Sequence, residues 1–198
     1  MATAWTLQRL APPTERAVSL EQAKLNLRFT SAAMPLDSEI ISAIDAATEQ
    51  WEQDTDSPAI AAQYMQARCS FPASGAPIVL SKRPIQSVDF IQYDTGDDVQ
   101  TQVTLPESEY SVDLGRREIY RKTADSWPQS AFHNEAVQIT YTAGYKDATT
   151  VPRYVQRAIM LQVHRWIIDP GMEFSEQARF EYAYESLVTK HLATFHSS

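Results

Sequence analysis

Cysteine, glycine and long apolar runs are scarce in this sequence, and each shortage excludes a class of protein. The single cysteine, Cys69, has no partner for an internal disulfide, which fits a reducing compartment. Because it lies in a strand-like run, we interpret it as a small packed side chain instead of a nucleophile. The five glycines leave little room for glycine-rich phosphate loops. No apolar run approaches the roughly 20 residues that cross a bilayer, so we expect no membrane span.

The charge balance is acidic, with a formal net charge of −8 and a pI of about 5.0. Such a chain does not neutralise phosphates over a broad surface, so we expect no tight nucleic-acid binding, although DNA could slide past it. Hydrophobic residues make up 43% of the 198 residues and charged residues 21%, as in ordinary globular proteins. The length therefore predicts one domain with a real core, or one domain with an arm.

The first 60 residues predict an extended arm followed by two helices. Residues 1–18 include Pro12-Pro13, which opposes helix locally. Ser19 with Gln22 forms a capping-box pattern, which predicts a short helix through Leu27. A second helix is predicted from Asp37, as its N-cap, to about residue 51, because apolar residues recur there at helical spacing. We interpret the carboxylates at 54 and 56 as part of a solvated connection.

The middle of the chain changes to the two-residue period of β-strands. The predicted strands are residues 63–71, 77–80, 87–93, 99–104, 110–114, 116–121 and 137–143. Residues 95–98 predict the tip of a hairpin between two of them. No helix-sized crossover lies between these strands, so we expect a small, mainly antiparallel sheet.

The last 50 residues return to helix. Pro152 suits a first helical turn, and an apolar stripe follows until Pro170-Gly171 ends the helix. A further helix is predicted over residues 174–194. We therefore predict an α+β fold with a mainly helical body, formed by two N-terminal and two C-terminal helices, and a small antiparallel β-sheet region inserted between them.

No constellation of residues predicts catalysis, cofactor binding or a metal site. The four histidines form no zinc-binding pattern, and no nucleophile elbow, Walker loop or dinucleotide fingerprint occurs. Asp94, Asp97 and Asp98 could bind a cation, or serve a small carboxylate-dependent hydrolase. They lack calcium-loop spacing, however, and hairpin tips favour aspartate for conformational reasons. We expect a protein that is not an enzyme and needs no cofactor.

A basic segment stands out in this acidic chain. It contains four cationic side chains, Arg116, Arg117, Arg121 and Lys122. The segment is interpreted either as a solvated strand or hairpin, or as a contact to an acidic protein surface or to passing DNA.

The final helix carries more aromatic and apolar side chains than one buried stripe requires. The candidate partner-binding residues are Phe174, Phe180, Tyr182, Tyr184, Leu187, Val188, Leu192 and Phe195. Tyr182 lies off the stripe that contains Phe180 and Tyr184. Either both faces pack within the fold, or one face binds a partner, since aromatic side chains are favoured in interface cores.

Several segments, taken in order, resemble one known family. They are the Pro12-Pro13 arm, Ala17-Val-Ser-Leu-Glu-Gln-Ala-Lys-Leu-Asn-Leu-Arg28, Ala46-Ala-Thr-Glu-Gln-Trp-Glu52, Ile78-Val-Leu-Ser-Lys-Arg-Pro-Ile-Gln-Ser-Val88 and Val137-Gln-Ile-Thr-Tyr-Thr-Ala-Gly-Tyr145. Together with Trp5, Val151-Pro152 and the helix containing Trp166, they cover about residues 5–168. The pattern resembles the gp6-like head–tail connector family, the adaptor or head-completion proteins of tailed phages, prophages and gene transfer agents.

This resemblance implies a structural virion protein of the neck, assembled in the bacterial cytoplasm. It implies a homo-oligomeric ring of about twelve copies beneath the portal protein, which extends the DNA channel and docks the next head-completion, stopper or tail protein. DNA would pass through the lumen without specific binding. The implied organisation is an arm (1–18), an adaptor domain (19–171) and a C-terminal portal-binding segment (172–198). We expect deletion of residues 174–198 to spare folding and to abolish attachment to the portal. Alternatives are another neck component, such as a stopper or tail-completion protein, or a small DNA-packaging accessory protein.

Overall fold

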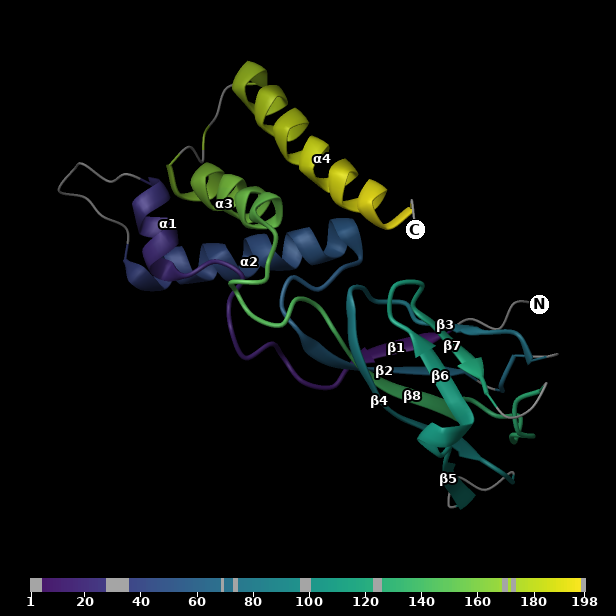
Figure 1. Ribbon diagram of the computed structural model, residues 1–198. Helices are drawn as coiled ribbons and strands as arrows, with labels where there is room; N and C mark the ends of the chain where they lie inside the picture. The colour runs from purple at the N-terminus through teal and green to yellow at the C-terminus, as the bar shows by residue number, and fades with distance from the viewer. Residues whose placement is uncertain are drawn as a thin grey trace. The chain divides into compact units, whose positions relative to one another are not determined.

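The computed structural model describes residues 5–27, 36–68, 70–72, 75–96, 101–122, 126–168, 171 and 174–196, without the side chains at 174, 175, 195 and 196. The chain divides into two compact units, each built from two stretches of sequence. Residues 1–13 and 61–144 form the β unit, and residues 14–60 and 145–198 form the helical unit (Figure 1).

The helical unit contains four helices within its described residues. They are α1 (Leu20–Leu27), α2 (Asp37–Thr55), α3 (Arg153–Ile168) and α4 (Phe174–His196). Helix α2 packs against α3, and α1 and α4 each contact both of these helices. The core consists of fully buried apolar side chains of α2 and α3, namely Ile40, Ile44, Ala47, Trp51, Val155, Ile159 and Val163. Their i, i+3, i+4 spacing is the amphipathic pattern that predicted both helices.

The helix starts show one prediction confirmed and one corrected. At α1, the Ser19 hydroxyl accepts a hydrogen bond from the Gln22 N–H at 3.1 Å, and the Gln22 side-chain oxygen accepts one from the Ser19 N–H at 3.0 Å. This is the predicted capping box. Asp37, predicted as an N-cap, is instead the first residue of α2. There the Glu39 carboxylate accepts a hydrogen bond from the Leu36 N–H at 3.1 Å and satisfies that donor.

The described residues of the β unit form two antiparallel sheets. The larger sheet has the order β1 (Thr6–Arg9), β2 (Ala62–Arg68), β8 (Val137–Ala143), β4 (Ile85–Asp94) and β5 (Gln102–Thr104). The smaller sheet has the order β3 (Ile78–Val79), β7 (Glu118–Arg121) and β6 (Tyr110–Asp113), and a 3₁₀ turn, Glu107–Glu109, precedes β6.

The two sheets share one buried core. Tyr64 of β2 lies opposite Tyr141 of β8, with ring centroids 6.0 Å apart. Gln66 is fully buried on the same face, where its side-chain amide donates to the Val79 carbonyl at 2.9 Å and its side-chain oxygen accepts from the Ser81 N–H at 2.8 Å. This glutamine ties the larger sheet to the smaller one and leaves neither of its polar ends unpaired, as a buried amide requires.

The α+β class is confirmed, but the predicted mainly helical body with a small inserted sheet is not. Sequence patterning anticipated one small sheet, whereas the structure has two sheets with a core of their own. The predicted arm contributes β1, because Leu7 and Trp5 pack against that core and the backbone pairs with β2. The predicted hairpin is present as the β4–β5 pair. Residues 97–100, which include the second half of the predicted tip, and Cys69 lie outside the described residues. The division at residues 18 and 171 stays a prediction.

Candidate functional site

Helix α4 is docked on α2 and α3 through one of its faces. Tyr184 is only 7% exposed, and its ring lies edge-on to Trp51 with centroids 6.5 Å apart. Its hydroxyl donates to the Asp54 carboxylate at 2.8 Å. Burial, together with this carboxylate, raises the pKa of Tyr184 above the ordinary value of a tyrosine. Tyr184 is therefore a packing residue that joins α4 to the end of α2.

The other stripe residues of α4 also face inward. Phe180, Leu187 and Val188 are partly buried against the helical core. The Arg165 guanidinium lies over the Phe180 ring, 5.3 Å from its centroid. These contacts within the unit favour the packing interpretation for this face of α4.

His191 is a residue of α4 that sequence reasoning missed. It is fully buried, its Nδ1 lies 3.0 Å from the Tyr154 hydroxyl, and its ring is edge-on to Trp51 at 5.1 Å. The pattern offered a weak signal, because His191 follows Tyr184 at i+7 on the same stripe. Its contacts anchor the C-terminal half of α4 to α2 and α3.

Tyr182 is the outward-facing aromatic of α4 among the side chains described. It is 77% exposed, whereas Leu192 is half-buried. Phe174 and Phe195 belong to α4, but their side chains lie outside the described residues. Of the predicted partner-binding aromatics whose side chains are described, Tyr182 is thus the one available to another molecule while α4 stays docked.

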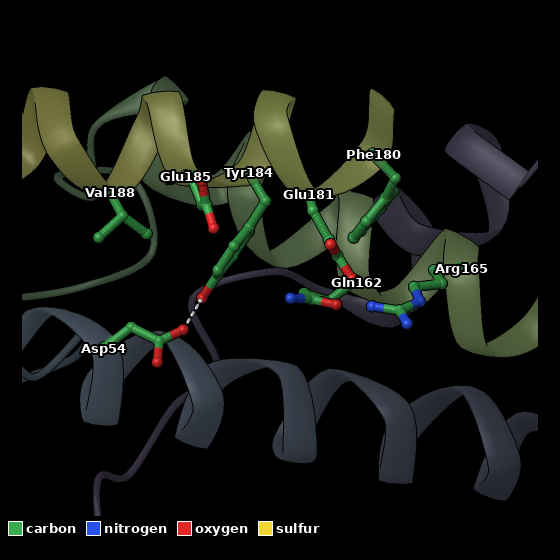
Figure 2. A pocket seen from close by; sticks show the side chains of 8 residues that line it. All are labelled: Asp54, Gln162, Arg165, Phe180, Glu181, Tyr184, Glu185 and Val188. Carbon is green, nitrogen blue, oxygen red and sulfur yellow. Dashed lines mark hydrogen bonds between the residues drawn. The ribbon is translucent and has the colours of Figure 1, made fainter. Parts of the chain in front are cut away.

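A hollow of about 340 Å³ lies between α4, α3 and the end of α2 (Figure 2). It is lined by Asp54, Gln162, Arg165, Phe180, Glu181, Tyr184, Glu185 and Val188. Three of these residues are carboxylates and one is a guanidinium, so the lining is acidic. We call this surface the acidic face. Asp54, interpreted from sequence as part of a solvated connection, reaches it because α2 continues one turn beyond Trp51.

A second hollow, of about 420 Å³, lies between α1 and α3. Its lining residues are Val18, Gln22, Asn26, Arg153, Gln156, Arg157 and Met160. At about 3.6 residues per turn, the α3 residues that line it lie on a different side of this helix from Gln162 and Arg165. Among the described lining residues, two are arginines and none carries a carboxylate. We call this surface the basic face. Neither hollow was predicted from the sequence, because each is assembled from helices far apart along the chain.

The basic segment lies in the smaller sheet of the β unit, and its four side chains separate into two pairs. The Arg117 guanidinium donates to the carbonyls of Leu80 and Ser81 at 3.2 Å, and Arg121 forms an ion pair with Glu109 at 2.6 Å. These two cations stabilise the unit's own loops and strands. The other two, Arg116 and Lys122, are exposed.

The Arg116 and Lys122 side chains do not form a broad cationic patch. Arg116 lies 4.0 Å from the Asp113 carboxylate, and hydrogen bonding to Tyr120 is the main cause that raises its pKa. Two exposed cations, one of them beside a carboxylate, provide little surface for phosphate contacts.

The described residues contain no metal-binding or membrane-spanning feature. No group of three or more histidine, cysteine, aspartate or glutamate side chains is placed to hold a metal ion in the described ranges. Asp94 is buried, and its carboxylate lies 3.2 Å from His133, whereas Asp97 and Asp98 fall outside the description. Among the described helices, none combines the length and apolar character that crossing a bilayer demands.

The fold is similar to chains of known structure from gene transfer agent (GTA) particles. No protein-family model matches the chain, and no curated protein matches it. A chain from the virion of the native GTA particle is 16% identical with a TM-score of 0.74, covering 93% of this chain and 94% of that one.

Two structures of the GTA neck give matches of the same extent. A chain from the neck of the empty particle, computed with C6 symmetry, is 16% identical with a TM-score of 0.72. A chain from the neck of the native particle, computed with C12 symmetry, is 17% identical with a TM-score of 0.70. Each match covers 94% of both chains. Along nearly its whole length, this chain therefore has the fold of chains found in GTA particles.

Proposed function

We propose that this chain is a structural subunit of the neck of a tailed-phage or gene transfer agent particle. The observation that carries the proposal is its likeness in fold to a chain in the neck of a native GTA particle, which covers 94% of both chains. Coverage of this extent includes both the helical unit and the β unit, so the likeness is to the combination of the two and not to one common module.

The specific role we propose is that of the adaptor, a ring of about twelve copies that binds the portal protein and docks the next neck or tail protein. The C12 symmetry of one similar neck structure supports a multi-subunit ring. The segments that resemble head–tail connector proteins support the adaptor role within the neck. In a ring, each copy binds its two neighbours through two different surfaces. Such a heterologous contact, repeated by rotation, closes into a ring.

The proposed ring is electrostatically suited to a passage for DNA. Twelve copies with a formal charge of −8 each would carry −96 charges. An acidic channel wall lacks the lysine and arginine side chains that displace counterions from DNA phosphates. DNA would therefore pass without binding specifically. The role requires no catalytic residue, cofactor or metal ion.

We propose that the C-terminal segment contacts the portal protein through the exposed side of α4 and its last turns. Tyr182 is the exposed aromatic there, and aromatic side chains are favoured in interface cores. Removal of the whole helix is a poor test of this role, because it would uncover Trp51 and the other core residues that α4 covers. The substitution Tyr182→Ala leaves the buried contacts in place and should weaken attachment to portal-containing heads.

The proposed function is tested by imaging particles from the producing cell and locating this chain. We expect about twelve copies in one ring, in direct contact with the portal, and tailless DNA-filled heads when the gene is deleted. A location below another ring, away from the portal, would contradict the adaptor role and indicate a stopper or tail-completion protein. Absence of the chain from the neck would contradict the whole proposal.

A further inference from the structure

The basic face carries two guanidiniums for which the described part of the chain supplies no counter-charge. Arg153 and Arg157 are exposed, and neither forms an ion pair within the described residues. They lie in the first two turns of α3, where the helix dipole disfavours cations. In a chain with 25 acidic and 17 basic residues, two adjacent arginines at this position are not explained by the stability of the helix. A carboxylate supplied from another molecule would give them a counter-charge.

The acidic face has the opposite excess of charge. Glu181 and Glu185 are exposed and line the hollow beside Asp54, and Figure 2 shows both on the same helix above it. Arg165 is the one cation among the lining residues that the structure describes, and its guanidinium lies over the Phe180 ring. Three carboxylates thus face one guanidinium, which leaves this surface negative.

The spacing of the charges on the two faces is the same. Arg153 and Arg157 are four residues apart on α3, and Glu181 and Glu185 are four residues apart on α4. On a helix this spacing places two side chains one turn apart on the same side, with Cβ atoms about 5–6 Å apart. When α3 of one molecule lies along α4 of another, each guanidinium can therefore reach one carboxylate at the same time. The two hollows, of about 420 and 340 Å³, give the long side chains space to interdigitate.

We propose that the basic face of one copy binds the acidic face of the next copy, with Arg153 and Arg157 paired to Glu181 and Glu185. This inference rests on the proposed function and identifies the surfaces through which its ring would form. The two faces are different and use different sides of α3, so the contact is heterologous and joins copies head to tail. Charge complementarity of this kind selects the partner and fixes its register.

Charge reversal of each face provides the test. The variant Arg153→Glu/Arg157→Glu has two negative faces, and the variant Glu181→Arg/Glu185→Arg has two positive faces. We expect the apparent dissociation constant for self-association, measured by sedimentation equilibrium at low salt, to rise at least about tenfold in each variant alone. An equimolar mixture of the two should associate again, because every contact is then between opposite charges. The quadruple variant, with both faces exchanged, should associate by itself.

A matched control changes the same amount of charge elsewhere. The variant Arg116→Glu/Lys122→Glu lowers the net charge by four, as Arg153→Glu/Arg157→Glu does, but alters exposed cations of the β unit. It should retain wild-type association. An equal loss in this control would show that net charge, and not the basic face, governs association, and would overturn the inference.

The remaining outcomes separate this inference from the proposed function. A wild-type chain that stays monomeric up to its solubility limit, or a mixture of the two variants that fails to associate, overturns the proposed interface. Neither result affects the neck role, which particle imaging tests independently. If the variants associate as the charge exchange predicts but the chain is absent from particle necks, the result supports the interface and contradicts the proposed function.

Discussion

Two tyrosines in one helix give a sharp test of how α4 is docked. Tyr184 is 7% exposed and Tyr182 is 77% exposed, although they are two residues apart in α4. The substitution to alanine is the same at both positions, so intrinsic helix propensity changes equally. Any difference in the free energy of unfolding must come from the contacts of the two side chains.

The expected cost of Tyr184→Ala follows from those contacts. Loss of a buried aromatic side chain costs about 3–5 kcal/mol, which includes its edge-on contact with Trp51. The hydrogen bond to Asp54 adds little, about 0.5–1 kcal/mol, because that carboxylate is exposed and well solvated. Alanine returns roughly 0.5 kcal/mol through its higher helix propensity. We expect a net loss of about 3–5.5 kcal/mol.

Tyr182→Ala should change stability by no more than about 0.5 kcal/mol, as is usual for an exposed surface position. Urea unfolding followed by far-ultraviolet circular dichroism measures both variants against wild type. Equal effects of the two substitutions, or a loss below about 1 kcal/mol for Tyr184→Ala, would refute the docked position of α4.

Two further predictions concern the helical unit. Ser19→Ala removes the hydroxyl that caps α1 and should lower the free energy of unfolding by about 1 kcal/mol. The control Ser38→Ala, at an exposed position in the first turn of α2, should lower it by less. Urea denaturation measures both variants, and equal losses would contradict the capping role of Ser19. The raised pKa of Tyr184 means that the folded protein favours the neutral phenol. The stability that this provides is complete below the unfolded tyrosine pKa of about 10 and is lost as pH rises through the higher folded value. Above about pH 10, the free energy of unfolding should therefore fall more steeply with pH for wild type than for Tyr184→Phe. Urea titrations at a series of pH values measure both, and parallel curves would show that Tyr184 does not contribute to this pH dependence.

The helices were largely predictable because their signals are local. The capping box at Ser19 and the apolar stripes of α2 and α3 lie within a few residues of the structure that they determine. The same stripe in α4 predicted that Tyr182 faces away from Tyr184. Strand β1 has no comparable local signal, since its partner β2 begins more than 50 residues later, at Ala62.

The two charged faces could not be predicted because each depends on distant contacts. Asp54 reaches the acidic face only because α2 continues to Thr55. Asp54 and Tyr184 are 130 positions apart in the sequence, so local sequence patterns cannot reveal their hydrogen bond. The basic face likewise combines α1 with α3, which are separated in the sequence by α2 and by residues 61–144 of the β unit. The charges were visible in the sequence, but the packing that groups them was not.

The order of the strands has a consequence for synthesis on the ribosome. Strand β8 lies in the centre of the larger sheet, between β2 and β4, yet it is the last strand to be translated. Before residue 143 emerges, β1–β2 and β4–β5 have no common neighbour to join them. Helices α1 and α2 are translated early, but α3 and α4, which pack against them, are translated only after β8. The nascent chain thus keeps apolar strand and helix surfaces uncovered until nearly three-quarters of it has been made, a period in which chaperone binding would prevent aggregation.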